Sequence, residues 1–514
     1  MLFRRVLPVL CGALMMLPVV AQEAATLSLT PVGTFSHAGF DEGGSEINAY
    51  HPASKTLFVV NAGANALDLL DLTDVGAPSL NITLKTQIVL DEYGDGINSV
   101  AIYGDIVAAA IANDQDNGVV AFFTPDGTFV SQVTVGALPD MVIFTPDGTK
   151  VLTANEGEPS DDYATDPEGS VSIIDISGGI EGLTDAKVTT VSLETANDND
   201  SLIIYGPNAT VAQDVEPEYI AISEDSTTAY VVAQENNGIL AIDIASAALT
   251  STFSLGTKDL SVEGNGIDGG KDDGVINIAN YPIQALYRPD AIVIVGEYLI
   301  TANEGDTRDY DGYSEEGELG ETPLDETVYP NADELATEDA IGGLEILTSV
   351  GDTDGDGDID QMTISGARSI STRTLTGELA WDSGDQMERT IAEVNPENFN
   401  ATHDENGSFD DRSDNAGPEP EGLAVGMVGD KNYLFVGFER IGGVMVYDLS
   451  TLPEPTFVTY VNNRDFEGDA EAGTAGDLGP EGLTFVAAAD SPNGVALLIV
   501  SNEISSTTTI YEVK

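Results

Sequence analysis

The stretch that decides the fold lies between residues 139 and 176. It reads "PDMVIFTPDG" (139–148), "VLTANEG" (151–157) and "GSVSIIDI" (169–176), three short runs rich in Val, Ile and Thr that are separated by turn residues. Such runs are typical of antiparallel strands joined by tight turns. The motif "TANEG" returns at 301–305, again after an apolar run, which indicates that the unit is repeated.

Six further groups have the same internal order of strands and turns. They begin at "SEINAYHP" (45–52), "INSVAIYG" (97–104), "PEYIAISEDS" (217–226), "PDAIVIVG" (289–296), "PEGLAVGMV" (420–428) and "PEGLTFVAA" (480–488). A fourth strand follows in most units, but the last unit reaches Lys514 after three, and "TLSLTPVGTF" (26–35) can supply the missing one. We therefore predict an all-β fold, a seven-bladed β-propeller closed by an N-terminal strand.

An acidic insertion from about residue 306 to 367 interrupts the fifth blade. It contains Tyr310, Tyr313 and Tyr329, and the sequence leaves open whether it is a mobile lid or a solvated loop. No stretch has the apolar period of a long helix, and no linker separates two domains. We expect residues 22–514 to form a single propeller domain and a monomer.

Residues 1–21 have the pattern of a secretory signal peptide. Arg4 and Arg5 precede the apolar run "VLPVLCGALMMLPVV", and Val19 and Ala21 form a small-residue cleavage site. No later stretch approaches the roughly 20 apolar residues of a membrane span. We expect secretion to the periplasm or the medium after cleavage behind Ala21. Cys11, the only cysteine, lies in this segment, so no disulfide is expected in the mature chain.

The net charge is −70, and removal of residues 1–21, which hold two arginines and no acidic residue, makes it −72. Such a charge repels phosphate backbones, which excludes nucleic acid as a partner. A hydrated acidic surface suited to a saline habitat explains most carboxylates. Bound cations are a second explanation for some of them, because they would relieve the repulsion.

Carboxylates recur at two positions of the repeat. The first strands open with Glu46, Asn98, Asp140, Glu218, Asp290, Glu421 and Glu481, and the second strands end with Ala62, Asp114, Glu156, Glu235, Glu304, Glu439 and Glu503. In a propeller these positions converge on the central channel, where unpaired carboxylates are costly unless they hold cations. The alternative is that they face solvent or bond to neighbouring blades.

We expect calcium as the bound cation, and Mg²⁺ or Mn²⁺ are the less favoured alternatives. All of the repeated ligands are oxygen donors, and only three histidines are present to serve zinc or copper. The predicted ligands at the channel are Glu156, Glu235, Glu304, Glu421, Glu439, Glu481 and Glu503.

A second calcium signal is "DTDGDGDID" (352–360). Asp352, Asp354, Asp356, Asp358 and Asp360 alternate with other residues around Gly357, which is the spacing of a loop that wraps one ion. The twelfth position is Thr363, so the bidentate Glu of an EF-hand is absent. We expect a structural calcium loop, and the alternative is a flexible acidic turn.

All eight arginines of the mature chain lie between Arg288 and Arg464. Arg308, Arg412 and Arg440 directly adjoin repeat carboxylate motifs, so we treat them as candidate ligands for an anionic small molecule or glycan. Simple charge pairing is the alternative. The sequence contains no nucleophile elbow, P-loop or dinucleotide fingerprint, so any hydrolysis would have to be assisted by a metal.

Several long motifs resemble one known family. "TANEGEPSDDY", "TANEGDTRDY", "DTDGDGDIDQMTISGARSIS", "GELAWDSGDQMER" and "FDDRSDNAGPEPEGLAVG" occur in the order typical of the choice-of-anchor I family of secreted bacterial proteins. The resemblance spans essentially the whole mature chain and implies a β-propeller related in pattern to phytase-like and surface-layer propellers. Because the chain ends at "IYEVK" without a sorting tail, release rather than anchoring is the expectation.

The resemblance supplies no catalytic residues. Members are often joined to a metallophosphatase domain, and this sequence lacks one. The leading hypothesis is therefore a secreted calcium-binding propeller that acts as an extracellular binding or surface-interaction module. The alternatives are a calcium-dependent phosphoesterase of phytase-like type, which would use the channel carboxylates with the three arginines, and a lactonase-like or esterase-like propeller.

Overall fold

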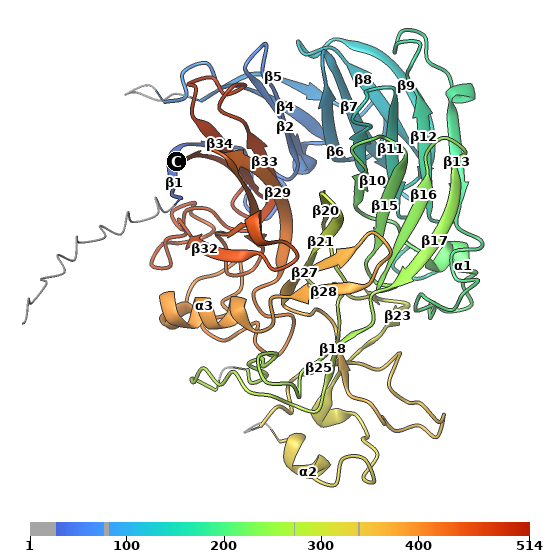
Figure 1. Ribbon diagram of the computed structural model, residues 1–514, viewed down its shortest axis with the longest axis vertical. Coiled ribbons are helices and arrows are strands. Elements are labelled where there is room, and N and C mark those ends of the chain that lie inside the picture. The colour runs from blue at the N-terminus through green and yellow to red at the C-terminus, as the bar shows by residue number, and fades with distance from the viewer. Residues whose placement is uncertain (1–26, 77–81, 272, 338–339) are drawn as a thin grey trace, which may run out of the picture.

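The computed structural model describes residues 27–76, 82–271, 273–337 and 340–514 (Figure 1). The predicted signal peptide, residues 1–21, lies outside the described residues. No helix in the described ranges is long and apolar enough to cross a membrane.

Most of the described strands form seven four-stranded antiparallel sheets, in which consecutive strands are neighbours. Sheets 1 to 3 consist of β2 (Asn48–His51), β3 (Thr56–Asn61), β4 (Ala66–Asp71) and β5 (Thr83–Val89); β6 (Gly96–Tyr103), β7 (Ile106–Asn113), β8 (Asp116–Phe123) and β9 (Phe129–Ala137); and β10 (Pro139–Phe144), β11 (Lys150–Asn155), β12 (Ser170–Asp175) and β13 (Val188–Ser192).

Sheets 4 to 7 follow the same order along the chain. They consist of β14 (Ile220–Ile222), β15 (Thr228–Ala233), β16 (Gly238–Asp243) and β17 (Ala248–Ser254); β20 (Ile292–Val295), β21 (Tyr298–Asn303), β27 (Ser369–Thr374) and β28 (Leu379–Asp382); β29 (Pro420–Val428), β30 (Lys431–Phe438), β31 (Val444–Asp448) and β32 (Thr456–Val461); and β33 (Pro480–Val486), β34 (Ala496–Asn502), β35 (Thr507–Val513) and β1 (Leu29–Ser36).

The apolar side chains show how the sheets are arranged. Each pair of consecutive sheets shares one buried apolar cluster, and a further cluster joins sheet 7 to sheet 1. Strand β2 contacts both β6 and β33, so the first strands also meet where the ring closes. In a β-propeller, each sheet packs its two faces against its two neighbours, and the first strands surround the central axis. The shared clusters and the contacts of β2 show this arrangement. The predicted all-β propeller is confirmed.

The ring closes through β1 and a buried histidine. Strand β1 pairs antiparallel with β35 and so completes sheet 7. Directly after β1, the side chain of His37 is buried and contacts Asp68 of sheet 1 through Nδ1 (2.6 Å) and Thr508 of sheet 7 through Nε2 (2.9 Å). Burial acts to raise the pKa of Asp68, but the hydrogen bonds with His37, Asn61 and Gln87 together lower that pKa. One side chain therefore ties the first sheet to the last.

The repeated "TANEG" motif ends the second strands β11 and β21. The amide of Asn155 is buried and donates to the hydroxyls of Ser170 and Ser172, at 3.2 and 3.0 Å. Asn303 does the same with Ser369 and Ser371, at 3.1 and 2.8 Å. The asparagine thus fastens the end of the second strand to the third strand, while the following glutamate turns toward the centre of the ring.

The glycine of the motif is required by close backbone contact. Gly305 has a φ of 114°, and a Cβ built there would lie 2.1 Å from the Cα of Gly366. Any other residue would have to displace backbone atoms.

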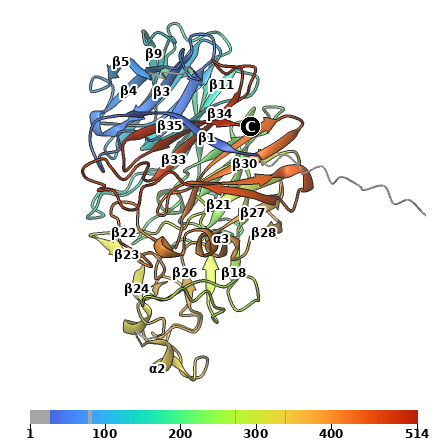
Figure 2. The same cartoon turned by 90° about the vertical axis from the view of Figure 1, so that its left-hand side faces the viewer.

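The predicted acidic loop at 306–367 is wrong as a description of this segment. The segment forms β22 (Asp309–Tyr310), β23 (Tyr313–Ser314), β24 (Glu316–Glu318), α2 (Ala332–Leu335), β25 (Glu345–Leu347) and β26 (Thr363–Ile364). It packs together with residues 257–286, which hold β18 (Thr257–Asp259) and β19 (Gln284–Leu286), and β19 pairs in parallel with β26. We call residues 257–286 and 306–367 the satellite module; it projects to one side of the sheets in both views (Figures 1 and 2).

The satellite module has an apolar core of its own. The buried side chains are Leu260, Ile267, Ile283, Ala285, Leu319, Leu324, Tyr329, Ile341, Leu344, Ile346, Ile359, Met362 and Ile364. They come from two segments separated along the chain, and their spacing follows neither the period of a strand nor that of a helix. The sequence of one segment alone therefore does not predict the core. The packed core contradicts the interpretation of this segment as a solvated loop.

The remaining helices are short. They are α1 (Val211–Asp214), α3 (Gln386–Val394) and the 3₁₀ turns Ala62–Ala64, Asp185–Lys187, Leu319–Glu321, Pro396–Asn398 and Leu449–Thr451. Helix α3 buries Met387 and Ile391 against sheets 5 and 6.

Replacement of Asn303 by alanine tests the role of the "TANEG" amide. Thr301, Ser369 and Ser371 would each lose a buried hydrogen-bond partner, so we expect Asn303→Ala to lower the free energy of unfolding by about 1–3 kcal/mol. Denaturant unfolding measures the change, and the exposed Asn432→Ala is the control. Equal stability of the two variants would contradict the structural role of this amide.

Candidate functional site

The first strands enclose a cavity of about 220 Å³ at the centre of the ring. Five of the seven opening positions line it: Asn98, Asp140, Asp290, Glu421 and Glu481. Burial raises the pKa of Glu421 and of Glu481 well above the ordinary value, and neighbouring carboxylates raise both further. The centre of the propeller is therefore an acidic channel.

Three carboxylates meet at one end of this channel. Oxygen atoms of Glu304, Glu421 and Glu439 lie within 4.8 Å of one another, and we call these residues the acidic triad. Glu304 and Glu439 directly follow the second strands β21 and β30, whereas Glu421 lies at the start of the first strand β29. The triad thus combines the two repeat positions that the sequence singled out.

Two oxygen atoms of the triad are buried without a hydrogen-bond partner among the described residues, Oε2 of Glu421 and Oε2 of Glu439. Glu439 as a whole is only 7% exposed. A buried carboxylate oxygen that accepts no hydrogen bond costs free energy unless a proton or a cation satisfies it.

The three triad members differ in electrostatic environment. Burial, followed by the charge of Glu439, raises the pKa of Glu304 well above its ordinary value, and the same two causes act on Glu421. Burial also acts to raise the pKa of Glu439, but the hydrogen bond from His403 and the charge of Arg440 lower it to about 2. Of the three triad members, Glu439 is therefore the one whose charged form its surroundings favour.

The other predicted channel ligands lie outside the triad. Glu156, Glu235 and Glu503 also end second strands, and burial raises the pKa of each. Glu481 lines the central cavity, where its Oε2 is buried without a partner. The structure thus brings three of the seven predicted ligands into one group and spreads the other four around the channel.

Several residues of the channel and of the surroundings of the triad were not among the predicted site residues. Glu218 has a buried Oε2 without a partner, and the carboxylate of Glu419 holds two arginines. Glu218 occupies the same repeat position as Glu421 and could have been included on that ground. Glu419 and His403 lie in loops outside the repeat, so no periodic signal marks them.

The three predicted arginines have different surroundings. Arg308 is 1% exposed, forms ion pairs with Asp214 and Glu216 and lies 4.7 Å over the ring of Tyr205. These contacts account for Arg308 by charge pairing alone.

Arg412 and Arg440 face the triad together. They bind opposite oxygens of Glu419, at 2.7 Å from Arg412 Nη2 to Oε1 and 2.6 Å from Arg440 Nε to Oε2. Arg440 also contacts His403 and Glu439. About a quarter of each arginine side chain is exposed, 22% for Arg412 and 24% for Arg440.

A second cavity of about 370 Å³ opens beside the triad, and we call it the mouth pocket. Its lining residues are Glu158, Glu304, Gly305, Asp306, Thr307, Asp309, Tyr310, Glu316, Arg412, Asn415, Ala416, Glu419 and Arg440. The pocket joins the loop after β21 to the loop before β29, so sheets 5 and 6 and the satellite module all contribute to it.

The loops that follow the two "TANEG" motifs pack against each other at the rim of this pocket. The hydroxyl of Tyr310 donates to Glu158 (3.2 Å), and its ring meets Tyr163 edge to face at 5.5 Å. The backbone N–H of Gly312 donates to the carbonyl of Asp161 (2.7 Å). The residues that differ after the repeated motif therefore form one wall.

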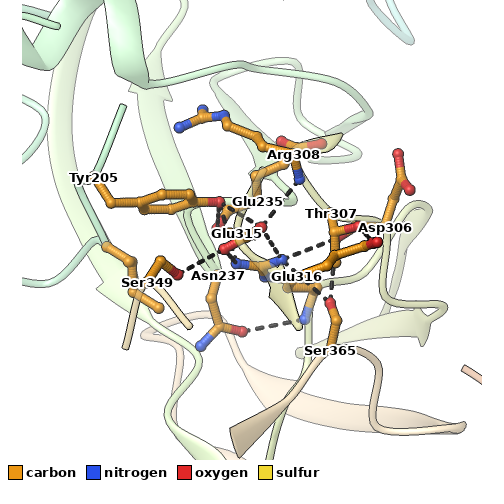
Figure 3. Close-up of polar contacts among 12 residues, drawn as sticks. Tyr205, Glu235, Asn237, Asp306, Thr307, Arg308, Glu315, Glu316, Ser349 and Ser365 are labelled. Carbon is orange, nitrogen blue, oxygen red and sulfur yellow. Dashed lines mark hydrogen bonds and ion pairs between the residues drawn. The ribbon is translucent and has the colours of Figure 1, made fainter. Parts of the chain in front are cut away.

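The satellite module is fixed to the ring by a buried polar network around Glu315 (Figure 3). The Arg288 guanidinium donates to both oxygens of Glu315, at 2.7 and 2.9 Å, and Tyr205 and Ser349 donate to the same carboxylate. Burial acts to raise the pKa of Glu315, but the charge of Arg288 lowers it. The pocket wall built by this module is therefore anchored rather than loosely attached.

The predicted calcium loop at 352–360 is exposed on the satellite module. Carboxylate oxygens of Asp352, Asp354 and Asp356 lie within 4.8 Å of one another, and Asp356 raises the pKa of Asp354. Asp360 instead accepts hydrogen bonds from Thr353 (2.7 and 2.6 Å), and Asp358 is outside the group. Three of the five predicted ligands are thus close together.

Comparison with known proteins identifies the family. A model of the choice-of-anchor I domain matches residues 46–452. The chain belongs to this family. The matched region contains all three members of the acidic triad, both arginines of the mouth pocket and the satellite module, so the candidate site is part of the choice-of-anchor I domain.

Two animal proteins are similar in sequence. Gigasin-3a of Magallana gigas is 30% identical over 185 residues, which cover 34% of this chain and 65% of that protein. A mesenchyme-specific cell surface glycoprotein of Strongylocentrotus purpuratus is 28% identical over 283 residues, 48% of this chain and 36% of that protein. The matches therefore span less than two thirds of either relative.

Two solved structures are similar in shape. The hydrazine synthase of Kuenenia stuttgartiensis has a TM-score of 0.45 at 14% identity, over 93% of this chain and 97% of that one. The β-propeller domain of Myceliophteria thermophila Cps50 (Swd1) has a TM-score of 0.44 at 9% identity, over 95% and 100%. The propeller description of this choice-of-anchor I domain rests on its own sheet order and shared clusters.

The channel carboxylates predict an unusual pH dependence of stability. Burial, with neighbouring carboxylates, raises the pKa of Glu46 to about 9, of Asp140 to about 7 and of Asp290 to about 6. Between about pH 4 and 9 the metal-free folded state then binds more protons than the unfolded chain, so raising the pH lowers the free energy of unfolding. We expect denaturant unfolding in chelator to show this decrease from pH 5 to 9.

Excess calcium should reduce the decrease, because a cation binds the ionised carboxylates and replaces their protons. As a control for ionic strength, sodium replaces calcium at matched ionic strength in a buffer free of calcium and magnesium. Unfolding is then measured over the same pH range. Stability in chelator that is constant or increases between pH 6 and 9 would contradict the assigned environment of these carboxylates.

Proposed function

We propose that this protein is a secreted calcium-binding β-propeller of seven blades that acts as an extracellular binding module. The single observation that carries the proposal is the acidic triad, in which three carboxylates converge and two buried oxygens lack a partner. A hard divalent cation at this point satisfies both oxygens and removes the repulsion among the carboxylates.

Calcium fits this site better than the other divalent cations. The three members of the triad are carboxylates, which supply oxygen ligands only, and they come from different strand ends rather than from one rigid loop. Calcium accepts six to eight oxygens in flexible geometry, whereas magnesium requires a near-regular octahedron. The loop at Asp352, Asp354 and Asp356 is proposed as a second, structural calcium site.

The extracellular location is proposed from two features of the chain. Residues 1–21 have the pattern of a signal peptide. One of its relatives is named a cell surface glycoprotein. A strongly acidic surface is also compatible with an environment in which divalent cations are abundant.

A calcium-dependent phosphoesterase is the second candidate function. It is favoured by the position of Arg412 and Arg440 beside the triad, where they could stabilise charge on a phosphoryl group held by a cation. The binding role is preferred because Glu419 and Glu439 already form ion pairs with these two guanidinium groups.

Calcium addition with variants of the triad tests the proposal. At a calcium concentration 100 times its Kd, we expect the free energy of unfolding of the wild-type protein to rise by about 2.7 kcal/mol. Glu421→Gln should lose most of this increase, because it keeps the shape of the side chain but removes its charge. Glu224→Gln, an exposed position far along the chain from the triad, is the control and should respond as wild type.

An equal response of the two variants would refute cation binding at the triad. Hydrolysis of a phosphomonoester and a phosphodiester, measured on the same calcium-loaded samples, separates the two functions. Turnover that Arg440→Gln abolishes while calcium stabilisation persists would replace the binding role with the phosphoesterase.

A further inference from the structure

The mouth pocket is rich in groups that accept hydrogen bonds. Six of the residues that line it are carboxylates: Glu158, Glu304, Asp306, Asp309, Glu316 and Glu419. Only Arg412 and Arg440 bring positive charge. A ligand that enters this pocket must therefore offer mainly donors.

The two arginines are largely committed to protein carboxylates. Arg412 donates to Oε1 of Glu419 through Nε (3.1 Å) and Nη2 (2.7 Å), and Arg440 donates to Oε2 through Nε (2.6 Å). Arg440 Nη1 also lies 3.0 Å from Glu439. An anion would have to displace these pairs and approach six carboxylates, so a carboxylate or phosphate ligand is disfavoured electrostatically.

A cation at the acidic triad would keep coordination positions open. The triad offers at most six oxygens, and two of them already accept hydrogen bonds: Glu304 Oε2 from Gln234 (2.9 Å) and Glu439 Oε1 from His403 and Arg440. Calcium takes six to eight oxygens. Glu304 both belongs to the triad and lines the mouth pocket, whereas Glu421 lines the central cavity, so a cation at the triad would border the mouth pocket on the Glu304 side.

We propose that the mouth pocket binds a neutral sugar, two adjacent hydroxyl groups of which complete the coordination of the cation at the triad. This inference rests on the proposed function. Hydroxyl oxygens are hard ligands without charge, and their protons can be donated to the carboxylates of Asp306 and Asp309, which are exposed on the wall.

The aromatic side chain of Tyr310 favours a sugar over a smaller polyol as the ligand. Tyr310 lines the pocket and is held by its hydrogen bond to Glu158 and by its contact with Tyr163. A fixed aromatic side chain offers an apolar surface to the C–H face of a sugar ring, while the carboxylates meet its hydroxyl edge. A few placed polar groups beside an aromatic surface are typical of small-ligand pockets.

Saturation-transfer NMR with defined glycosides tests the inference on the full-length mature protein. The probes are the methyl glycosides of mannose, galactose and glucose, with galacturonate and inorganic phosphate as anionic comparisons. We expect saturation transfer to at least one neutral glycoside in calcium and none after chelation. Signals from the anions alone, or from no probe although calcium stabilises the protein, would overturn the sugar site and leave the calcium site standing.

A lack of calcium stabilisation would overturn the proposed function itself, and the sugar site with it. The two failures are therefore distinguishable, because unfolding is measured in calcium on the same samples before the glycosides are added.

Two variants, one in the loop before β22 and one at the tip of the β22–β23 hairpin, locate the sugar. Asp306→Asn removes a charged acceptor from the pocket wall, so we expect glycoside affinity to fall by about tenfold, as for the loss of one charge-assisted hydrogen bond. Asp311→Asn changes the exposed tip of the hairpin between β22 and β23, outside the pocket lining, and should leave the affinity within about twofold of wild type. Both variants should keep the calcium response. Equal affinities of the two variants would contradict the placement.

Discussion

Repulsion among carboxylates at the centre of the ring is the constraint on which the rest of this structure depends. A propeller places equivalent strand ends of every sheet around one axis, so glutamates at the same position of each repeat lie close together. Burial and mutual charge raise the pKa values of Glu304, Glu421 and Glu481 well above the ordinary value. The fold therefore creates a site that only protons or cations can stabilise.

Buried arginines counter the same acidity elsewhere in the molecule. Arg288 is paired with Glu315, Arg308 with Asp214 and Glu216, and Arg368 with Glu388, all with almost no exposed surface. A chain with 88 acidic and 18 basic residues thus uses much of its scarce positive charge inside. Against this pattern, the acidic triad stands out because the basic side chains that contact it, His403 and Arg440, bind Glu439, whereas no basic partner of Glu421 is among the described contacts.

The parts of the fold that repeat could be predicted from the sequence. The three strand runs around "TANEG" have a clear turn-bounded pattern, and the position of Glu304 and Glu439 at the ends of second strands follows directly from it. The family resemblance, carried by long motifs in a fixed order, is confirmed by the match to residues 46–452.

The parts that do not repeat could not be predicted in the same way. The core of the satellite module is assembled from Leu260 and Ile346, among others, in segments that are far apart in the chain. The sequence placed Arg308 and Arg412 in one class because both adjoin acidic motifs. Only the structure shows that Arg308 is enclosed by Asp214 and Glu216 while Arg412 lines the mouth pocket. Charge pairing depends on distance in space, which spacing along the chain does not give.

The most direct measurement is an experimental crystal structure of the calcium-loaded protein, with manganese exchanged for calcium in a second crystal to give an anomalous signal. The account predicts one anomalous peak at about 2.1–2.6 Å from carboxylate oxygens of Glu304, Glu421 and Glu439, the range of calcium–oxygen and manganese–oxygen bonds. Density that shows the three carboxylates apart, or joined only by protons and water with no anomalous peak at saturating manganese, would contradict it.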